Sequence, residues 1–286
     1  MATIRVSLLV AVLALLAGVV PPARAAASGT PLTVATYNLR YHNAADGADA
    51  WPLRRAAVKA LIRFHAFDVF GTQEGLNDQI QDLAALDEYG HVGAGRDDGR
   101  QAGEHSAIFY RRDRFSLQRS GDFWLSETPE RPSLGWDATC CKRIASWAQF
   151  RDAASGKNFY VFSVHFDHQG VVARRESARL VLRRISEIAG GEPVICLGDF
   201  NATPDSEPIA TMRGALRDAR QASLVPPYGP EATFNDFKWH LAPTARIDYI
   251  FVGRQFRVLK YGVLSDSLNQ RYPSDHFPVM AQVVLE

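Results

Sequence analysis

Polar residues that can bind a metal ion or a phosphate stand repeatedly at the ends of short apolar runs in this sequence. Asn38, Glu74, His165, Asp199 and Asn201 each end or follow such a run, Asp248 lies near the start of another, and Asp275 and His276 directly precede the last one. Carboxylate and amide oxygens are ligands that Mg²⁺ and Mn²⁺ prefer, and an imidazole beside a carboxylate can handle a proton next to a phosphate. Because a single carboxylate after a strand is most often a turn former or a helix cap, only the whole set points to chemistry.

Short runs rich in β-branched and aromatic residues predict the strands that must position these side chains. The predicted strands are Leu32–Tyr37, Asp68–Thr72, Ser106–Tyr110, Asn158–His165, Pro193–Leu197, Ile247–Val252 and Val279–Leu285. Since strand ends at one edge of a sheet lie close together, these strands can gather the polar residues into one site.

Two helices are predicted between the strands. The first runs from Pro52 to Phe64, and its predicted buried face consists of Leu53, Ala57, Ala60, Leu61 and Phe64. The second, Val171–Ala189, carries an apolar stripe formed by Ala178, Val181, Leu182, Ile185 and Ile188. Its many arginines are interpreted as a solvated face. The alternation of helix and strand favours one α/β or α+β unit.

Two polar stretches, Asp97–Glu104 and Gly121–Cys141, are predicted to be surface loops, where substrate contacts tend to lie. Some further residues could line a cleft or could equally serve packing and surface capping. They are Arg40, Trp51, Trp136 and Arg143. Asp167 and His168 follow His165 closely, which suggests a second metal site. Alternate side chains of an extended segment point to opposite faces, however, and this favours a structural role for His168.

The three cysteines differ in their surroundings. Cys196 lies inside an apolar run, which predicts a small buried hydrophobic side chain. Cys140 and Cys141 are adjacent, and neither a histidine nor another cysteine lies near them at the spacing of a zinc site. Because adjacent cysteines bond to each other only in an unfavourable geometry, the prediction is free or mixed-disulfide thiols.

The composition is that of an ordinary globular protein: 286 residues, 47% hydrophobic and 22% charged, which excludes disorder, collagen and a protein with many membrane spans. The apolar run Val6–Val20, after Arg5 and before Ala23-Arg24-Ala25, predicts a signal peptide over residues 1–25, with the cut uncertain by a couple of residues. The expected location is therefore secreted or periplasmic. A single catalytic domain is predicted over residues 26–286.

The net charge gives no support to a nucleic-acid substrate. Lys and Arg number 32 against 31 Asp and Glu, and the loss of Arg5 and Arg24 with the signal peptide would leave 30 basic against 31 acidic residues, a net charge of −1. A strongly basic balance would favour binding to nucleic acid or to an anionic membrane. Its absence weakens that interpretation without removing it, since a local patch can act alone.

Taken together, the motifs resemble those of the endonuclease/exonuclease/phosphatase superfamily. The blocks that carry the resemblance are Thr36-Tyr37-Asn38-Leu39-Arg40, Gly71-Thr72-Gln73-Glu74, Ser163-Val164-His165, Gly198-Asp199-Phe200-Asn201, Arg246-Ile247-Asp248-Tyr249-Ile250-Phe251 and Ser274-Asp275-His276-Phe277-Pro278-Val279. They occur in the order of the superfamily and span nearly the whole chain after residue 25. The resemblance implies an α/β fold: a two-sheet mixed β-sandwich flanked by helices, the deoxyribonuclease I-like four-layer sandwich.

The resemblance also implies hydrolysis of a phosphate ester with the help of a divalent metal. It makes Glu74 a ligand of Mg²⁺ or Mn²⁺, and it places Asn38 and Asp275 as supporting ligands or directly behind the ligand. These oxygen groups suit hard cations that retain bound water.

The remaining motif residues receive catalytic roles by the same resemblance. Asp199 positions or activates the attacking water, and Asn201 holds the phosphate or stabilises the transition state. His276 and Asp248 form a hydrogen-bonded pair, in which the carboxylate orients the imidazole and favours its charged form. His165 contacts the phosphate.

The preferred function is an exported Mg²⁺- or Mn²⁺-dependent phosphohydrolase, a phosphodiesterase or nuclease, expected to be a monomer without stable membrane insertion. A phosphatase of small phosphorylated sugars, inositols or nucleotides is the first alternative, because it needs only a small basic pocket. A sphingomyelinase-like lipid hydrolase is less favoured, since no long hydrophobic insertion is present. A non-catalytic binding protein is disfavoured because every motif position carries a chemically competent residue.

Overall fold

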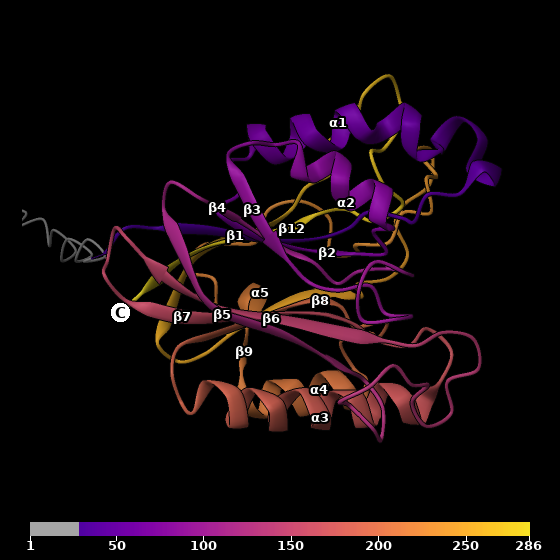
Figure 1. Ribbon diagram of the computed structural model, residues 1–286. Coiled ribbons are helices and arrows are strands. Elements are labelled where there is room, and N and C mark those ends of the chain that lie inside the picture. The colour runs from indigo at the N-terminus through magenta and orange to yellow at the C-terminus, as the bar shows by residue number, and fades with distance from the viewer. Residues whose placement is uncertain (1–28) are drawn as a thin grey trace, which may run out of the picture.

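The computed structural model describes residues 29–286, so the predicted signal peptide lies outside the described residues. Two mixed β-sheets of six strands each pack face to face between two layers of helices (Figure 1). The first sheet has the order β11-β12-β1-β2-β4-β3, and the second has the order β5-β6-β7-β8-β10-β9. This arrangement confirms the predicted four-layer sandwich of the deoxyribonuclease I-like class.

The strands of the first sheet are β1 (Leu32–Asn38), β2 (Val69–Gln73), β3 (Tyr89–Val92), β4 (Ile108–Arg111), β11 (Phe256–Val263) and β12 (Val279–Leu285). Those of the second sheet are β5 (Phe115–Trp124), β6 (Ile144–Asp152), β7 (Asn158–His165), β8 (Val194–Asp199), β9 (Arg217–Asp218) and β10 (Asp248–Val252). The helices are η1 (Ala44–Asp49), α1 (Trp51–Phe64), α2 (Asn77–Ala84), α3 (Val171–Ala189), α4 (Glu207–Ala215) and α5 (Ala219–Ala222). None of the helices in this part of the chain has the length and hydropathy needed to cross a membrane.

Strand direction explains why the predicted site residues share one edge of the sandwich. β1 runs parallel to β2, and β7 runs parallel to β8, so these four strands end at the same edge. β10 and β12 are antiparallel to β8 and β1, and they therefore start at that edge. The register places Asp199 opposite both His165 on β7 and Asp248 on β10.

The core lies between the two sheets, and two further apolar clusters fill the spaces under the helices. α1 and α2 cover the outer face of the first sheet, while α3 and α4 cover the outer face of the second (Figure 1). The sheets approach closely at Gly71 of β2, where a Cβ atom would lie 2.2 Å from Leu197 Cδ1 and 2.7 Å from Ser163 Oγ. Any larger residue here would have to displace the side chains of Leu197 and Ser163.

Arg114 ties the two sheets together at the edge opposite the site. Its Nη1 donates to the Asp68 carboxylate just before β2, at 2.9 Å, and its Nε donates to the Asp152 carboxylate at the end of β6, at 3.1 Å. Nη1 also donates to the carbonyl of Pro31, next to β1, at 2.8 Å. A single guanidinium thus satisfies acceptors from both sheets.

Most predicted elements are confirmed, with two corrections. Residues 121–124 were predicted to be part of a surface loop, but they complete strand β5, and Trp124 is buried. The predicted buried face of the first helix is wrong in part: Leu61 is buried as predicted, but Leu53 is 70% and Phe64 is 81% exposed. The helix instead buries Trp51, Arg54 and Val58. The stripe predicted for α3 is confirmed, since Ala178, Val181 and Ile185 are buried and Leu182 and Ile188 pack against them.

Candidate active site

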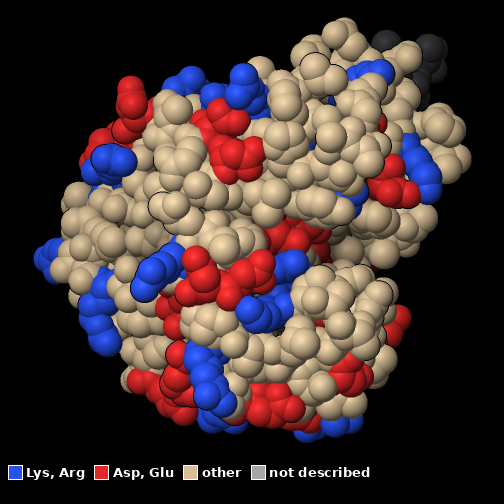
Figure 2. Space-filling model, turned by 45° about the vertical axis from the view of Figure 1, so that its right-hand side comes forward, with Lys and Arg blue, Asp and Glu red and all other residues tan. Residues whose placement is uncertain are grey.

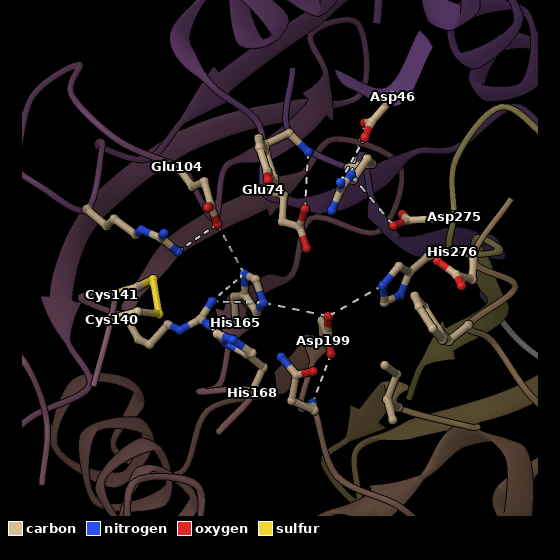
Figure 3. A pocket seen from close by; sticks show the side chains of 18 of the residues that line it. Asp46, Glu74, Glu104, Cys140, Cys141, His165, His168, Asp199, Asp275 and His276 are labelled. Carbon is tan, nitrogen blue, oxygen red and sulfur yellow. Dashed lines mark hydrogen bonds and ion pairs between the residues drawn. A yellow bond between two sulfur atoms is a disulfide. The ribbon is translucent and has the colours of Figure 1, made fainter. Parts of the chain in front are cut away.

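A cavity of about 630 Å³ opens at the edge where the central strands end (Figure 3). Its lining is dominated by charged and polar side chains from both sheets and from the loops that follow them. The lining residues are Arg40, Tyr41, Asp46, Glu74, Arg96, Glu104, Cys140, Cys141, Arg143, His165, His168, Asp199, Asn201, Phe234, Asp236, Phe237, Ile247, Asp275 and His276. Asn38 and Asp248 stand directly behind this lining, in contact with it.

Asn38 links the carboxylates of the two sheets. Its Nδ2 donates to Glu74 Oε1 and to Asp199 Oδ2, both at 3.0 Å, while its Oδ1 accepts from the backbone N–H of Arg40 at 3.0 Å. Glu74 Oε2 accepts from the backbone N–H of Tyr41 at 3.1 Å. Asn38 thus uses its amide nitrogen on both carboxylates, and its role in this geometry is to orient Glu74 and Asp199.

His276 is held between two aspartates. Its Nδ1 lies 2.9 Å from Asp248 Oδ2, which also accepts a hydrogen bond from Thr233 Oγ1, and its Nε2 lies 3.9 Å from Asp199 Oδ2. Burial opposes a charge on this imidazole, but the attraction and hydrogen bond of Asp248 outweigh burial and raise the pKa of His276 well above its usual value. His276 is therefore a charged donor whose Nε2 faces the cavity.

Arg143 is the centre of a second group of side chains, on the other side of Asp199. Its Nη1 lies 3.0 Å from His165 Nε2, its Nη2 lies 2.6 Å from His168 Nδ1, and its Nε donates to Asp167 Oδ2 at 3.3 Å. Burial, followed by the charge of Arg143, lowers the pKa of His165 well below its usual value. The site therefore pairs a neutral imidazole, His165, with a charged one, His276.

The carboxylates that face the cavity are crowded. Burial, reinforced by the charge of Asp248, raises the pKa of Asp199 to about 7. Burial and the charge of Glu74 raise the pKa of Asp275 to about 6, and the same two causes raise that of Glu104 to about 7. Arg40 offsets part of this charge, since its Nε lies 3.9 Å from Asp275 Oδ2. The guanidinium is itself held by two hydrogen bonds to Asp46, at 2.9 and 3.0 Å.

The backbone bends sharply just after the central strands. Arg40, Glu74 and Asn201 have φ values of 55°, 61° and 46°, in the left-handed region that residues other than glycine seldom adopt. Each turn is held by a hydrogen bond within the site; at Asn201, for example, the backbone N–H donates to Asp199 Oδ1 at 2.8 Å. Strained conformations of this kind concentrate at functional sites, because the surrounding structure must over-determine them.

The donor set of the cavity fits a hard divalent cation. Glu74, Asp199 and Asp275 crowd their carboxylates at one place, and their mutual repulsion contributes to the raised pKa values of Asp199 and Asp275. Atoms of Glu74, His165 and Asp199 that could bind one ion lie within 4.8 Å of one another. Mostly carboxylate oxygens with one imidazole suit Mg²⁺ or Mn²⁺, and a cation there would relieve the repulsion.

The structure brings all the predicted site residues together at this cavity, although their individual roles stay predictions. Arg40, Arg143 and His168 line the cavity as well. Trp51 does not, since its ring is buried and its Nε1 donates to Asp82 Oδ2 at 2.8 Å, and Trp136 packs under α3. The prediction of a structural role for His168, away from the site, was wrong. His168 lines the cavity because β7 ends at His165 and the chain is no longer extended beyond it.

Sequence reasoning missed Arg96 and Glu104, which form an ion pair of 2.6 Å on the cavity wall. Both flank a loop whose composition suggested only substrate contacts, and no local motif marks them. The prediction for the adjacent cysteines was also wrong. Cys140 and Cys141 form a disulfide with each other, whereas Cys196 is free and buried, as predicted.

Carboxylates, amides and imidazoles gathered where two mixed sheets end define a phosphoesterase hydrolase of the deoxyribonuclease I-like class. The chain belongs to the endonuclease/exonuclease/phosphatase family, whose model matches residues 35–276. This match confirms the resemblance seen in the motifs.

Solved structures of bacterial proteins cover most of the chain. A mannosyl-6-phosphatase from Bacteroides thetaiotaomicron VPI-5482 is 44% identical, with a TM-score of 0.85 over 89% of this chain and 100% of that protein. An endonuclease/exonuclease/phosphatase family protein from Bacteroides vulgatus is 40% identical, with a TM-score of 0.86 over 90% of this chain and 100% of that protein.

The curated relatives match shorter segments. Nocturnin of Drosophila melanogaster is 31% identical over 116 residues, which are 38% of this chain and 16% of the relative. An uncharacterized protein of Acanthamoeba polyphaga mimivirus is 36% identical over 81 residues, 27% of this chain and 30% of the relative. The matches thus span less than a third of the length of these curated relatives.

Proposed function

We propose that the protein is an exported, Mg²⁺- or Mn²⁺-dependent phosphatase that hydrolyses the phosphate monoester of a small phosphorylated sugar. One observation carries the proposal: the cationic side chains that face the cavity converge on a single small volume. Arg40, Arg143 and His276 surround the carboxylates from different sides. These groups line one cavity of about 630 Å³, which suits a single small phosphorylated molecule, whereas a polymer would need cationic contacts spread along its backbone.

The surface around the cavity supports a small substrate. Figure 2 shows acidic and basic side chains intermingled on the face where the hollow lies, without a continuous basic track. The arginines of α3 lie on the outer layer and pair with glutamates: Arg179 with Glu176 at 2.9 Å and Arg184 with Glu187 at 3.2 Å. The phosphodiesterase or nuclease preferred from the sequence needs a groove that neutralises several phosphates, and this surface favours the monoester instead.

Similarity gives the proposal independent support. The Bacteroides thetaiotaomicron protein that is 44% identical and aligns over its whole length is a mannosyl-6-phosphatase. We therefore propose a sugar that carries a phosphate on its 6-position as the substrate class.

The residues of the cavity divide the work of hydrolysis between them. Glu74 and Asp275 would hold the cation, with Asn38 behind them orienting Glu74, and the cation would supply positive charge to the phosphate as negative charge builds up in the transition state. Asp199 lies with both oxygens fixed, so it can orient the attacking water and accept its proton. His276 offers Nε2–H to a phosphate oxygen, and Asp248 keeps that proton in place.

Arg143 and His165 complete the phosphate contacts from the opposite side. The water oxygen bonds to phosphorus while Asp199 accepts one of its protons, and the bond from phosphorus to the sugar oxygen breaks. The sugar oxygen takes up a proton as Asp199 releases the one it accepted, and the products are inorganic phosphate and the free sugar hydroxyl. No residue of the chain becomes covalently modified in this sequence of events.

A substrate panel tests the proposal. Release of phosphate is measured from mannose 6-phosphate, inositol phosphates and nucleoside monophosphates, and cleavage is measured with bis(p-nitrophenyl) phosphate, DNA, RNA and sphingomyelin. Each substrate is tested with Mg²⁺, with Mn²⁺ and with EDTA. We expect the highest kcat/KM on a sugar monoester, and no hydrolysis of any substrate with EDTA. Preference for a diester would establish the nuclease or phosphodiesterase alternative, and no hydrolysis of any substrate would leave a binding protein.

Export is part of the proposal and has a test of its own. The Cys140–Cys141 disulfide supports it, because disulfides persist in oxidising compartments. Expression of the full chain in a bacterial host, followed by fractionation and N-terminal sequencing, should recover a protein outside the cytoplasm that begins within a couple of residues of Ala26. Recovery of cytoplasmic protein with residues 1–25 attached would contradict export.

A further inference from the structure

The Cys140–Cys141 disulfide is part of the cavity wall, on the side away from Asp275 and His276 (Figure 3). Cys140 is exposed and Cys141 is half-buried, and both line the cavity. Arg143, two residues further on, reaches inward to His165. The two sulfur atoms therefore border the space in which a substrate would sit.

This disulfide does not have the usual stabilising function. A disulfide stabilises a fold mainly by closing a long loop and so restricting the unfolded chain. A bond between neighbouring residues closes no loop of chain, and neither cysteine belongs to a buried apolar cluster. Its position at the cavity therefore requires a local explanation.

The segment that carries the disulfide is anchored on both sides. Asp137 accepts hydrogen bonds from the backbone N–H groups of Val172, at 3.0 Å, and Ala173, at 2.7 Å, in the first turn of α3. Lys142 Nζ donates to the carbonyl of Asp97 at 2.9 Å. The sulfurs are thus fixed relative to α3, to the loop from Asp97 to Glu104 and to the phosphate-binding groups.

The disulfide is an apolar surface in a wall of charges. Across the cavity, the apolar side chain of Phe234 packs edge-on against His276, with ring centroids 5.1 Å apart. Phe234 therefore holds the imidazole of His276 in place. On the disulfide side, Cys140 Sγ lies within 4.8 Å of polar atoms of Asp167 and His168, and Arg143 and the ion pair of Arg96 with Glu104 line the same part of the cavity (Figure 3). A surface of polarisable sulfur flanked by hydrogen-bonding groups matches a sugar ring, which offers C–H groups on its faces and hydroxyls at its edge.

We propose that the Cys140–Cys141 disulfide is a specificity-determining contact: the sugar ring of the substrate packs against its sulfurs, while Arg96 and Glu104 bind the ring hydroxyls. The inference rests on the proposed phosphatase function and names the wall that selects the sugar. The disulfide takes no part in breaking the phosphate ester. Two separate thiols or hydroxyls would present a smaller, polar and mobile surface in its place.

The test compares two substrates in the double variant Cys140→Ser/Cys141→Ser. Mannose 6-phosphate can contact the sulfurs, whereas ethyl phosphate carries the same phosphate without a ring. For mannose 6-phosphate we expect KM to rise about tenfold with kcat nearly unchanged, the size of effect that a lost apolar contact has on selectivity. For ethyl phosphate we expect kcat and KM to match those of the unaltered protein. Cys140→Ala/Cys141→Ala should behave in the same way.

The control is Cys196→Ser, which removes the buried cysteine of β8 and leaves the cavity wall intact. Thermal melting of every variant identifies a folding defect. Treatment of the unaltered protein with a phosphine reductant should reproduce the rise in KM, whereas the double variant should not respond to it.

The outcomes separate this inference from the proposed function. An equal loss on both substrates would show that the disulfide merely holds Arg143 in place, and unchanged constants on both would show that the ring does not touch it. Either result overturns the inference while the phosphatase stands. If the unaltered protein hydrolyses no phosphate monoester, the proposed function fails and takes this inference with it.

Discussion

Asp199 is a carboxylate whose oxygens are both fixed by neighbours. Asn38 donates to Oδ2 at 3.0 Å, and the backbone of Asn201 donates to Oδ1 at 2.8 Å. His165 Nε2 and His276 Nε2 lie 3.7 and 3.9 Å from Oδ2, on opposite sides. A water molecule that approaches this carboxylate therefore meets a base with a defined direction.

Asp199→Asn should remove the base and keep the shape of the side chain. We expect kcat to fall by roughly 10²–10⁴-fold, the contribution usual for a positioned general base, with the melting temperature nearly unchanged. Steady-state kinetics on a phosphate monoester measure the loss. Asp205→Asn, at an exposed aspartate outside the cavity, is the matched control. Turnover of Asp199→Asn close to that of the control would show that another group activates the water.

Arg143 contacts several partners at once. It can do so because its planar guanidinium carries several N–H groups, and not only because it is charged. Arg143→Lys keeps the positive charge but cannot reach Asp167, His165 and His168 together. We expect kcat/KM to fall by about tenfold or more. The exposed Arg179→Lys on α3 serves as the control. If both variants keep full kcat/KM, the positive charge alone suffices, and the several hydrogen bonds of the Arg143 guanidinium have no role in the reaction.

At this scale the sequence was informative where chemistry and strand ends coincide. Glu74, Asp199 and His276 could be predicted because each stands beside an apolar run in a short motif. Glu104 could not, since its approach to His165, with Oε2 3.7 Å from Nδ1, depends on the folding of a polar loop onto a distant strand. The Cys140–Cys141 disulfide was missed for a similar reason: the contacts that anchor its segment come from α3 and from the loop at Asp97.

At the scale of elements, Arg114 joins strands of different sheets at the far edge of the sandwich. Arg114→Ala should lower the free energy of unfolding by about 2 kcal/mol, the magnitude for hydrogen bonds to charged groups that are mostly buried. It should leave kcat unchanged because the site lies at the opposite edge. Urea unfolding and steady-state kinetics measure the two effects, with the exposed Arg119→Ala as the control.

The effect of Arg114→Ala should also depend on pH. Burial works to raise the pKa of Asp152, but hydrogen bonds from Arg114 and Ser155 outweigh it and hold the pKa below its usual value. A group whose pKa is lower in the folded protein stabilises the fold above its unfolded pKa and loses that contribution as pH falls. The difference between the two proteins should therefore be full at pH 7 and shrink below about pH 4. A constant difference over this range would exclude Asp152 as the partner that matters.

Elements were predictable from the sequence when apolar patterning decided their position. β5 escaped detection because most of its side chains are exposed or half-exposed on an edge strand, so it lacks a clear apolar alternation. The face of α1 was misassigned because Arg54 lies inside, where its guanidinium donates to the carbonyls of Leu39, Arg40 and Pro273. Hydrophobic periodicity can predict such a helix, but it cannot identify the buried face when a buried arginine determines how the helix is oriented.

At the scale of the whole molecule, a near-neutral net charge conceals a concentrated acidic cluster. Mg²⁺ or Mn²⁺ at a hundredfold excess over its Kd should stabilise the fold by about 2.7 kcal/mol. For a chain of this size that corresponds to a rise in Tm of roughly 5–10 °C over the protein in EDTA. Differential scanning calorimetry measures the shift without any substrate.

Glu74→Gln tests whether the shift arises at the proposed site. The variant keeps the size of the side chain but removes a carboxylate, so it should lose most of the rise in Tm. Asp205→Asn should keep the rise. An equal shift in Glu74→Gln would place the cation elsewhere on the protein, and no shift in any of the proteins would contradict a bound divalent ion.

The first sheet cannot close until β12 has been synthesised. β12 lies between β1 and β11, so β1 keeps one edge unpaired until residues 279–285 have been synthesised. Asp275 and His276 arrive immediately before them. A chain that stops before Asp275 therefore has neither a closed first sheet nor a complete site, and one that stops before Val279 leaves the edge of β1 open to pairing with another chain.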